Sequence, residues 1–168
     1  MSKIEILLID DEPNVRETIK ELLVFKNYNV RTAADGQEAL DLLEHAVPDL
    51  ILCDMVMPVM NGSELFDIVK SSTSYKHIPF IFLSAKNEID LIKKCLTDGA
   101  DGFLVKPFKI NELTLVLTAR LEELEKNKSQ ESRSLSVKKK RPSTLSNYSS
   151  EILPGRIKDC NWFDRSSK

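Results

Sequence analysis

The chain has 168 residues, 42% hydrophobic and 30% charged, which is enough to bury the core of one ordinary domain with residues to spare. Its net charge of −2 conceals an acidic body and a basic end. Residues 1–126 carry 14 Lys and Arg against 22 Asp and Glu, whereas residues 127–168 carry 10 against 4. This asymmetry predicts different roles for the two parts.

Cysteine usage and hydropathy exclude several classes of protein. The three cysteines, Cys53, Cys95 and Cys160, are odd in number and widely spaced, which argues against a disulfide framework or a zinc site. The first apolar run is too short for a signal peptide. No segment approaches the roughly 20 apolar residues that span a membrane. We therefore expect a cytoplasmic protein with no membrane span.

Short apolar runs alternate with helically spaced segments along residues 1–126. Strands are predicted at residues 4–9, 28–33, 50–53, 79–83 and 102–105. A helix is expected after each strand; Asp35-Gly36, Gly62, Asn87 (as a cap) and Ile110 mark the starts of the last four. Five such βα units require right-handed crossovers. The expected fold is therefore α/β, a doubly wound (βα)5 parallel sheet between two layers of helices.

Polar side chains follow the predicted strands where their carboxyl ends would meet. They are Asp10, Asp11, Asp54, Ser84 and Lys106. Because ligands of doubly wound sheets bind outside these strand ends, we expect the five to share one rim. Three crowded carboxylates repel one another, and Mg²⁺ or Mn²⁺ would offset the repulsion because such ions prefer oxygen ligands.

This set of residues suits phosphoryl transfer to a carboxylate. With a metal ion and Lys106 to neutralise charge and Ser84 to donate a hydroxyl, Asp54 can act as a nucleophile and form an aspartyl phosphate. Taken singly, each residue has an ordinary explanation, since Asp-Asp after a strand is commonly a solvated turn. The prediction depends on five such residues in order at the strand ends.

Five segments carry a family signature: LLIDDEPNVR, DGQEAL, PDLILCDMVMPVMNG, IPFIFLSAK and GADGFLVKPF. In these segments, residues 3–126 resemble the receiver domain of two-component response regulators. The resemblance covers essentially the whole α/β body and implies a flavodoxin-like fold with a chemotaxis-type phospho-acceptor site. We take residues 1–126 as this domain. It would be a signalling protein rather than an enzyme, catalysing only its own phosphotransfer and autodephosphorylation.

The resemblance also assigns roles and partners. Asp54 would be the phospho-acceptor, contacted through its phosphoryl group by Ser84 and Lys106. The implied metal ligands are Asp10, Asp11, Asp54 and the backbone carbonyl of Val56. Phe103 would be the aromatic switch that moves with Ser84. The donor would be a histidine kinase or phosphotransfer protein. A downstream protein or a second copy would bind the face formed by the fourth helix, fifth strand and fifth helix.

Two positions of this chain stand out within that pattern. Val56 offers the site no polar side chain, and Lys86 is placed to lean over the phosphate. We hypothesise that both tune the lifetime of the phosphate by restricting an attacking water. Phe103 lacks the hydroxyl of a tyrosine, so its switching would depend on packing.

Residues 127–168 read as a basic, Ser-rich linker or tail, with ten serines and the run KKKR at 138–141. The helix before it, ending LEELEKNKSQE, allows a short extension beyond the body. KKKR would suit nucleic-acid phosphates, an acidic partner or an anionic membrane, and a solvated linker is the simpler interpretation. The later segment ILPGRIKDCNWFD is too apolar for a pure linker. It either docks on a partner or starts a truncated output region.

Three other functions remain open. One is the N-terminal receiver of a larger transcription regulator whose DNA-binding output is missing here. A haloacid-dehalogenase-like phosphatase would want Asp-x-Asp after its first strand, whereas this chain has Asp10-Asp11-Glu12 and no room for a cap domain. A pseudo-receiver held in one state is disfavoured by the complete set of site residues.

Overall fold

The computed structural model describes the backbone of residues 3–138 and the side chains of residues 3–127. The chain divides after Lys128 into two units, and the fold below is that of the first. Its strands are β1 (Glu5–Ile9), β2 (Asn29–Ala33), β3 (Leu50–Asp54), β4 (Phe80–Ser84) and β5 (Gly102–Val105). All neighbours pair in parallel, in the order β2-β1-β3-β4-β5. The predicted doubly wound parallel sheet is confirmed.

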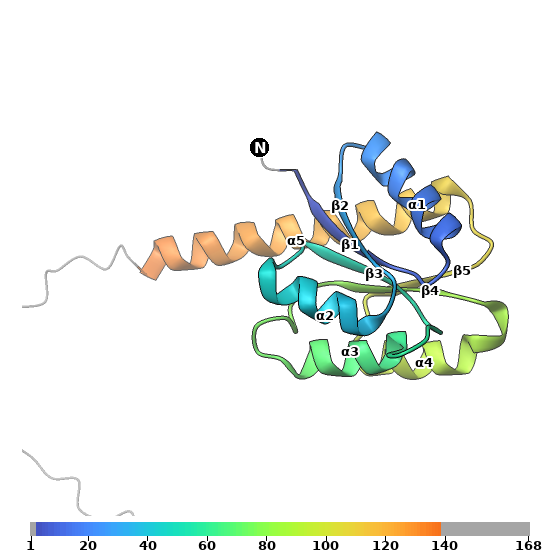
Figure 1. Ribbon diagram of the computed structural model, residues 1–168. Coiled ribbons are helices and arrows are strands. Elements are labelled where there is room, and N and C mark those ends of the chain that lie inside the picture. The colour runs from blue at the N-terminus through green and yellow to red at the C-terminus, as the bar shows by residue number, and fades with distance from the viewer. Residues whose placement is uncertain (1–2, 139–168) are drawn as a thin grey trace, which may run out of the picture. The chain divides into compact units, whose positions relative to one another are not determined.

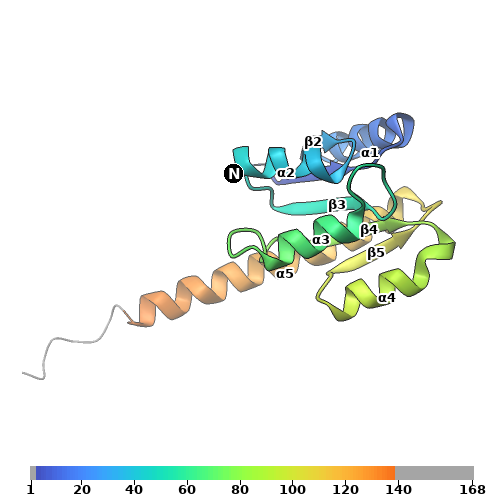
Figure 2. The same cartoon turned by 60° about the horizontal axis from the view of Figure 1, so that its bottom comes forward.

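Helices cover both faces of the sheet (Figures 1 and 2). They are α1 (Pro13–Phe25), α2 (Gly36–His45), α3 (Gly62–Ser71), the 3₁₀ turn η1 (Lys86–Glu88), α4 (Ile89–Thr97) and α5 (Ile110–Lys138). Buried side chains of α2, α3 and α4 pack with one face, and those of α1 and α5 pack with the other. The three-layer arrangement expected from the sequence is confirmed.

The strand pattern explains why the central runs are apolar throughout. In β1, Leu7 and Ile9 face the layer of α2, α3 and α4, whereas Ile6 and Leu8 face α1 and α5. Strands β3 and β4 are buried at every position, while the edge strands β2 and β5 are only partly buried. A strand covered on both faces needs apolar residues at successive positions, whereas an edge strand does not.

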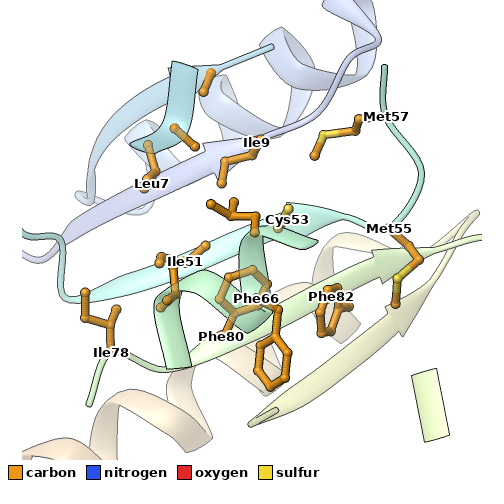
Figure 3. Close-up of a cluster of buried hydrophobic side chains, with 14 of the residues drawn as sticks. Leu7, Ile9, Ile51, Cys53, Met55, Met57, Phe66, Ile78, Phe80 and Phe82 are labelled. Atoms are coloured by element: carbon orange, nitrogen blue, oxygen red, sulfur yellow. The ribbon is translucent and has the colours of Figure 1, made fainter. Parts of the chain in front are cut away.

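Three phenylalanines form the aromatic centre of one layer (Figure 3). Phe66 of α3 lies 5.3 Å from Phe80 and 5.5 Å from Phe82 of β4, measured between ring centroids. The rings are tilted or edge-on rather than stacked face to face. Such geometry adds to the free energy of burial. This cluster fixes α3 on the sheet, and α3 begins directly after the loop that follows Asp54.

Of the four helix starts predicted, those of α2, α3 and α5 are confirmed and that of α4 is wrong. The Asp35 side chain caps α2 by accepting from the backbone N–H groups of Gln37 and Glu38. The prediction that Asn87 caps the fourth helix is wrong, because Asn87 lies inside η1. The Glu88 carboxylate accepts from the Ala85 N–H at 3.0 Å, and the Glu88 N–H donates to the Ala85 carbonyl at 3.1 Å. These two bonds close a 3₁₀ turn first, so α4 starts only after it.

Helix α5 continues to Lys138, further into the Ser-rich segment than the short extension expected. Residues 139–168 lie outside the described part of the chain, together with most of the KKKR run, Cys160 and ILPGRIKDCNWFD. The interpretations of those segments therefore stay predictions. Among the described helices, none is long and apolar enough to cross a membrane.

Replacing Phe66 by Ala should lower the free energy of unfolding by about 3–5 kcal/mol, because the side chain is only 1% exposed and leaves a cavity. Phe25→Ala is the matched control, since Phe25 at the end of α1 is 85% exposed, and it should change stability by about 0.5 kcal/mol or less. Urea unfolding followed by circular dichroism measures both. Equal losses in the two variants would contradict the packing described here.

Candidate functional site

Side chains from three strand ends meet at one edge of the sheet. Asp54 ends β3, Asp10 follows β1, and Lys106 follows β5. Strands β1 and β3 are neighbours with Ile9 opposite Cys53, which puts Asp10 beside Asp54. Asp10 is fully buried and Asp54 is 7% exposed. The structure therefore brings together two buried carboxylates that are 44 positions apart in the chain.

One ammonium group neutralises part of this charge. The Nζ atom of Lys106 donates to Oδ2 of Asp10 at 2.8 Å and to Oδ2 of Asp54 at 2.9 Å. Burial raises the pKa of Asp54, and Lys106 only partly offsets that effect. Burial also lowers the pKa of Lys106, but its hydrogen bonds to both carboxylates outweigh this, so that the pKa is raised overall. Lys106 is therefore held in its charged form.

Backbone contacts fix Asp10 further. Its Oδ1 accepts from the N–H of Glu12 at 2.9 Å, and its own N–H donates to the Ala33 carbonyl at 3.2 Å. Its carbonyl accepts from the guanidinium of Arg16. Neither Glu12 nor Arg16 was expected from the sequence to support the site. The contact with Glu12 could have been predicted, because an aspartate side chain commonly accepts from the backbone N–H two residues further along the chain. No sequence pattern indicates the contact with Arg16.

The carboxylates form a cluster that suits a hard cation. Ligand oxygens of Asp10, Asp11 and Asp54 lie within 4.8 Å of one another. Three carboxylates and one ammonium leave a formal charge of −2, which a divalent cation would cancel. Oxygen donors, with Asp11 open to solvent, fit Mg²⁺ or Mn²⁺, which keep several waters. The expected acidic metal site is thus present as a donor set.

Cys53 lies next to this cluster and takes no part as a ligand. It is fully buried, and its thiol donates to the Asp54 carbonyl at 3.1 Å. Burial first, and then the charges of Asp54 and Asp10, raise the pKa of this thiol well above its usual value. A thiol kept protonated is a poor metal ligand and a poor nucleophile. Cys53 is thus a small buried apolar residue of the core.

Ser84 reaches the same edge from β4. Leu83 pairs with Asp54 in register, so Ser84 lies one residue beyond the position of Asp54 on the adjacent strand. Its side chain is buried and its hydroxyl donates to the Ala85 carbonyl at 2.9 Å. Its own carbonyl accepts from the Lys106 N–H at 2.7 Å. The backbone of Ser84 thus supports Lys106 directly.

The remaining predicted residues lie on the solvent side. Val56, in the loop after β3, is 58% exposed, and Lys86 is exposed at the start of η1. Phe103 lies in β5 opposite Phe82 and is 40% exposed. These placements put Val56 and Lys86 just beyond two strand ends of the site, whereas Phe103 lies on the surface of the edge strand.

Gly62 closes the loop after Asp54. A Cβ atom on Gly62 would lie 2.2 Å from the Asp54 carbonyl oxygen, so only glycine fits there. Its N–H donates to the Met55 carbonyl at 2.9 Å. Gly62 is thus a position of close approach between the loop and the end of β3. Gly99, by contrast, needs its left-handed φ of 102°.

Comparison with curated proteins places the chain among response regulators. Response regulator MprA of Mycolicibacterium vanbaalenii is 36% identical over 118 residues, which are 70% of this chain and 50% of MprA. Transcriptional regulatory protein TrcR of Mycobacterium tuberculosis is 35% identical over 120 residues, 71% of this chain and 46% of TrcR. Sensor histidine kinase TmoS of Ectopseudomonas mendocina is 39% identical over 108 residues, 64% of this chain and 11% of TmoS. The chain spans half or less of each relative.

Solved structures agree over the α/β body. Chemotaxis response regulator CheY4 of Vibrio cholerae matches with a TM-score of 0.66 at 34% identity, covering 70% of this chain and 98% of that one. The receiver domain of NtrX from Brucella abortus matches with a TM-score of 0.66 at 29% identity, covering 70% and 98%. Both likenesses extend over nearly the whole of the compared chain.

The profile of the response regulator receiver domain matches residues 6–118, which include every strand end described above. The chain therefore belongs to the response regulator receiver domain family.

Proposed function

We propose that this receiver domain is a Mg²⁺-dependent phosphorylation switch in which Asp54 accepts a phosphoryl group from a histidine kinase or phosphotransfer protein. The observation that carries the proposal is the bridge of Lys106 between Asp54 and Asp10, beside the third carboxylate of Asp11. Structural ion pairs seldom need a third, uncompensated carboxylate next to them. A site that binds a cation and a phosphoryl group does need such a carboxylate, as a ligand for the cation.

Each residue then has a defined part in the transfer. An Asp54 carboxylate oxygen attacks phosphorus as the P–N bond to the donor histidine breaks, and the electron pair of that bond returns to the imidazole. The ammonium of Lys106, already 2.9 Å from Asp54, shifts its bond to a phosphoryl oxygen. Asp10, Asp11, Asp54 and the Val56 carbonyl would hold the cation. When bound, the cation neutralises charge on the phosphoryl oxygens.

The signal would then pass from Ser84 to Phe103. The Ser84 hydroxyl would exchange the Ala85 carbonyl for a phosphoryl oxygen, since its present partner is only the next residue. Phe103, 40% exposed on β5, would follow inward and change the surface formed by α4, β5 and α5. That surface would bind a downstream protein or a second copy of this chain.

A second candidate is the receiver of a transcription regulator, supported by the likeness to TrcR, which is about twice as long as the matched region. A phosphatase of the haloacid-dehalogenase type is less well supported, because Asp10 is fully buried and bonded to Lys106 rather than poised in an Asp-x-Asp pair. We place the protein in the cytoplasm, which agrees with the free thiols of Cys53 and Cys95.

Incubation with Mg²⁺ and acetyl phosphate should add the mass of one phosphoryl group to the intact chain. The reason is that the buried Asp54 carboxylate is the acceptor. Asp54→Asn should show no gain, whereas Asp90→Asn, an exposed aspartate on α4, should behave as the wild type. Intact-mass spectrometry reads the result. A gain that persists in Asp54→Asn would assign the acceptor elsewhere.

Mg²⁺ should stabilise the folded chain, and EDTA should reverse the effect. At about ten times its dissociation constant, a ligand that binds only the folded state adds about 1.4 kcal/mol to the free energy of unfolding. Asp11→Asn should lose most of this gain because a ligand is removed, while Asp90→Asn should retain it. Thermal unfolding with and without Mg²⁺ tests this, and an equal gain in Asp11→Asn would rule out the assigned ligand set.

Val56→Asn and Lys86→Ala should each speed hydrolysis of the aspartyl phosphate by about threefold or more, which is roughly 0.6 kcal/mol of barrier. The reason is that Val56 and Lys86 would otherwise restrict water at the exposed side of the site. Lys93→Ala, an exposed lysine on α4, is the control. Loss of the phosphoryl mass with time gives the rates. Unchanged rates in both test variants would end the tuning hypothesis.

A further inference from the structure

A glycine outside the site holds the far end of the loop that follows Asp54. Gly36, the first residue of α2, is buried, and its N–H donates to the Met60 carbonyl at 3.2 Å. A Cβ atom on Gly36 would lie 2.7 Å from Cγ and 2.8 Å from Sδ of Met60. Gly99 has a left-handed φ, but Gly36 does not, so the demand at Gly36 is for space. The Met60 side chain occupies the space that a side chain on Gly36 would need.

Buried side chains and a helix cap hold the loop from Met55 to Asn61 in a single backbone conformation. Met55 and Met57 point into the core (Figure 3), with exposures of 0% and 7%. Met60 packs against the same core cluster. At the end of the loop, Asn61 caps α3 through a reciprocal pair of bonds with Glu64. Val56 lies between two of these anchors, so its backbone has little freedom of its own.

Backbone strain within the loop supports this view. Val59 has a φ of 66°, which is a genuine outlier for a β-branched residue, and its side chain is 83% exposed. The Val59 side chain thus gains little from burial to offset the strain. A strained conformation persists only where its surroundings over-determine it. The Met60 N–H to Pro58 carbonyl bond of 2.8 Å spans Val59, and Gly36 holds Met60 beyond it.

We propose that Gly36 is a positioning residue for the metal site: by seating Met60, it fixes the loop that presents the Val56 carbonyl beside Asp54. Gly36 itself touches neither cation nor phosphate. This inference rests on the proposed function, because it takes the Val56 carbonyl as a metal ligand. It extends the supports of the site to α2, an element that contributes no ligand.

The test measures Mn²⁺ binding to the full chain without a phosphodonor, from the electron paramagnetic resonance signal of the free ion. Gly36→Ala should weaken Mn²⁺ affinity by about tenfold or more, as loss of an outer support typically does. Gly102→Ala is the matched control and should change affinity by about twofold or less. A Cβ there would meet only Val116 at 3.6 Å and Ile81 at 3.9 Å, which are ordinary contacts.

Met60→Ala distinguishes a positioning role from a general loss of stability. It removes Cγ and Sδ, so it should also weaken Mn²⁺ binding, even if Gly36→Ala fails to fold. The double variant Gly36→Ala/Met60→Ala should bind Mn²⁺ as Met60→Ala does, because the two closest atoms, Cγ and Sδ, are gone and only the contact with Cβ of residue 60 at 3.0 Å is left. Urea unfolding identifies conditions in which each variant is folded, and affinities are compared there.

The outcomes separate the two proposals. Unchanged Mn²⁺ affinity in folded Gly36→Ala, or losses that simply add in the double variant, would overturn the positioning role alone. Failure of the wild-type chain to bind Mn²⁺ would overturn both the positioning role and the proposed function. Non-additive loss in variants that remain folded would support the role of Gly36.

Discussion

The site depends on one ammonium group shared between two buried carboxylates. An isolated charge inside a protein is strongly unfavourable, and Asp10 and Asp54 are almost completely buried. Lys106 makes their burial tolerable by donating to both, yet a single positive charge cannot neutralise two carboxylates and the nearby Asp11. The arrangement is therefore stable enough to fold and still short of positive charge. That shortage is what makes the edge of the sheet attractive to a cation.

The order of the strands makes this sharing possible. Because β1 and β3 are neighbours, Asp10, directly after β1, lies beside Asp54 at the end of β3. Lys106 must reach them from β5, with β4 between, and the long lysine side chain can span that distance. The Ser84 carbonyl of β4 accepts from the backbone N–H of Lys106 and so fixes the position from which the Lys106 side chain extends. A shorter cationic side chain at the end of β5 would leave the carboxylates of Asp10 and Asp54 unpaired.

Much of this was predictable because it depends on local patterns. The buried strands β1, β3 and β4 are continuous apolar runs, and the rule that parallel strands share a rim was enough to gather Asp10, Asp54 and Lys106. The features that could not be predicted depend on contacts between distant segments, or on which of two neighbouring residues caps a helix. By residue type Asn87 is a better N-cap than its neighbour Glu88, but the two bonds between Ala85 and Glu88 place Asn87 inside the 3₁₀ turn. Nothing in DGQEAL indicates that Gly36 must leave room for Met60.

The edge position of β5 links the chemistry to the surface. Among the described strands, β5 pairs only with β4, so it is held on one side. It carries Phe103 and leads into Lys106, three residues later, so the lysine that would contact the phosphoryl group directly follows the strand that carries the proposed switch. The Lys106 ammonium is bound to Asp54, and in the proposed transfer a change of its partner would pull on the end of β5. We infer that a strand buried between two others would resist this movement, whereas an edge strand can pass it to the surface.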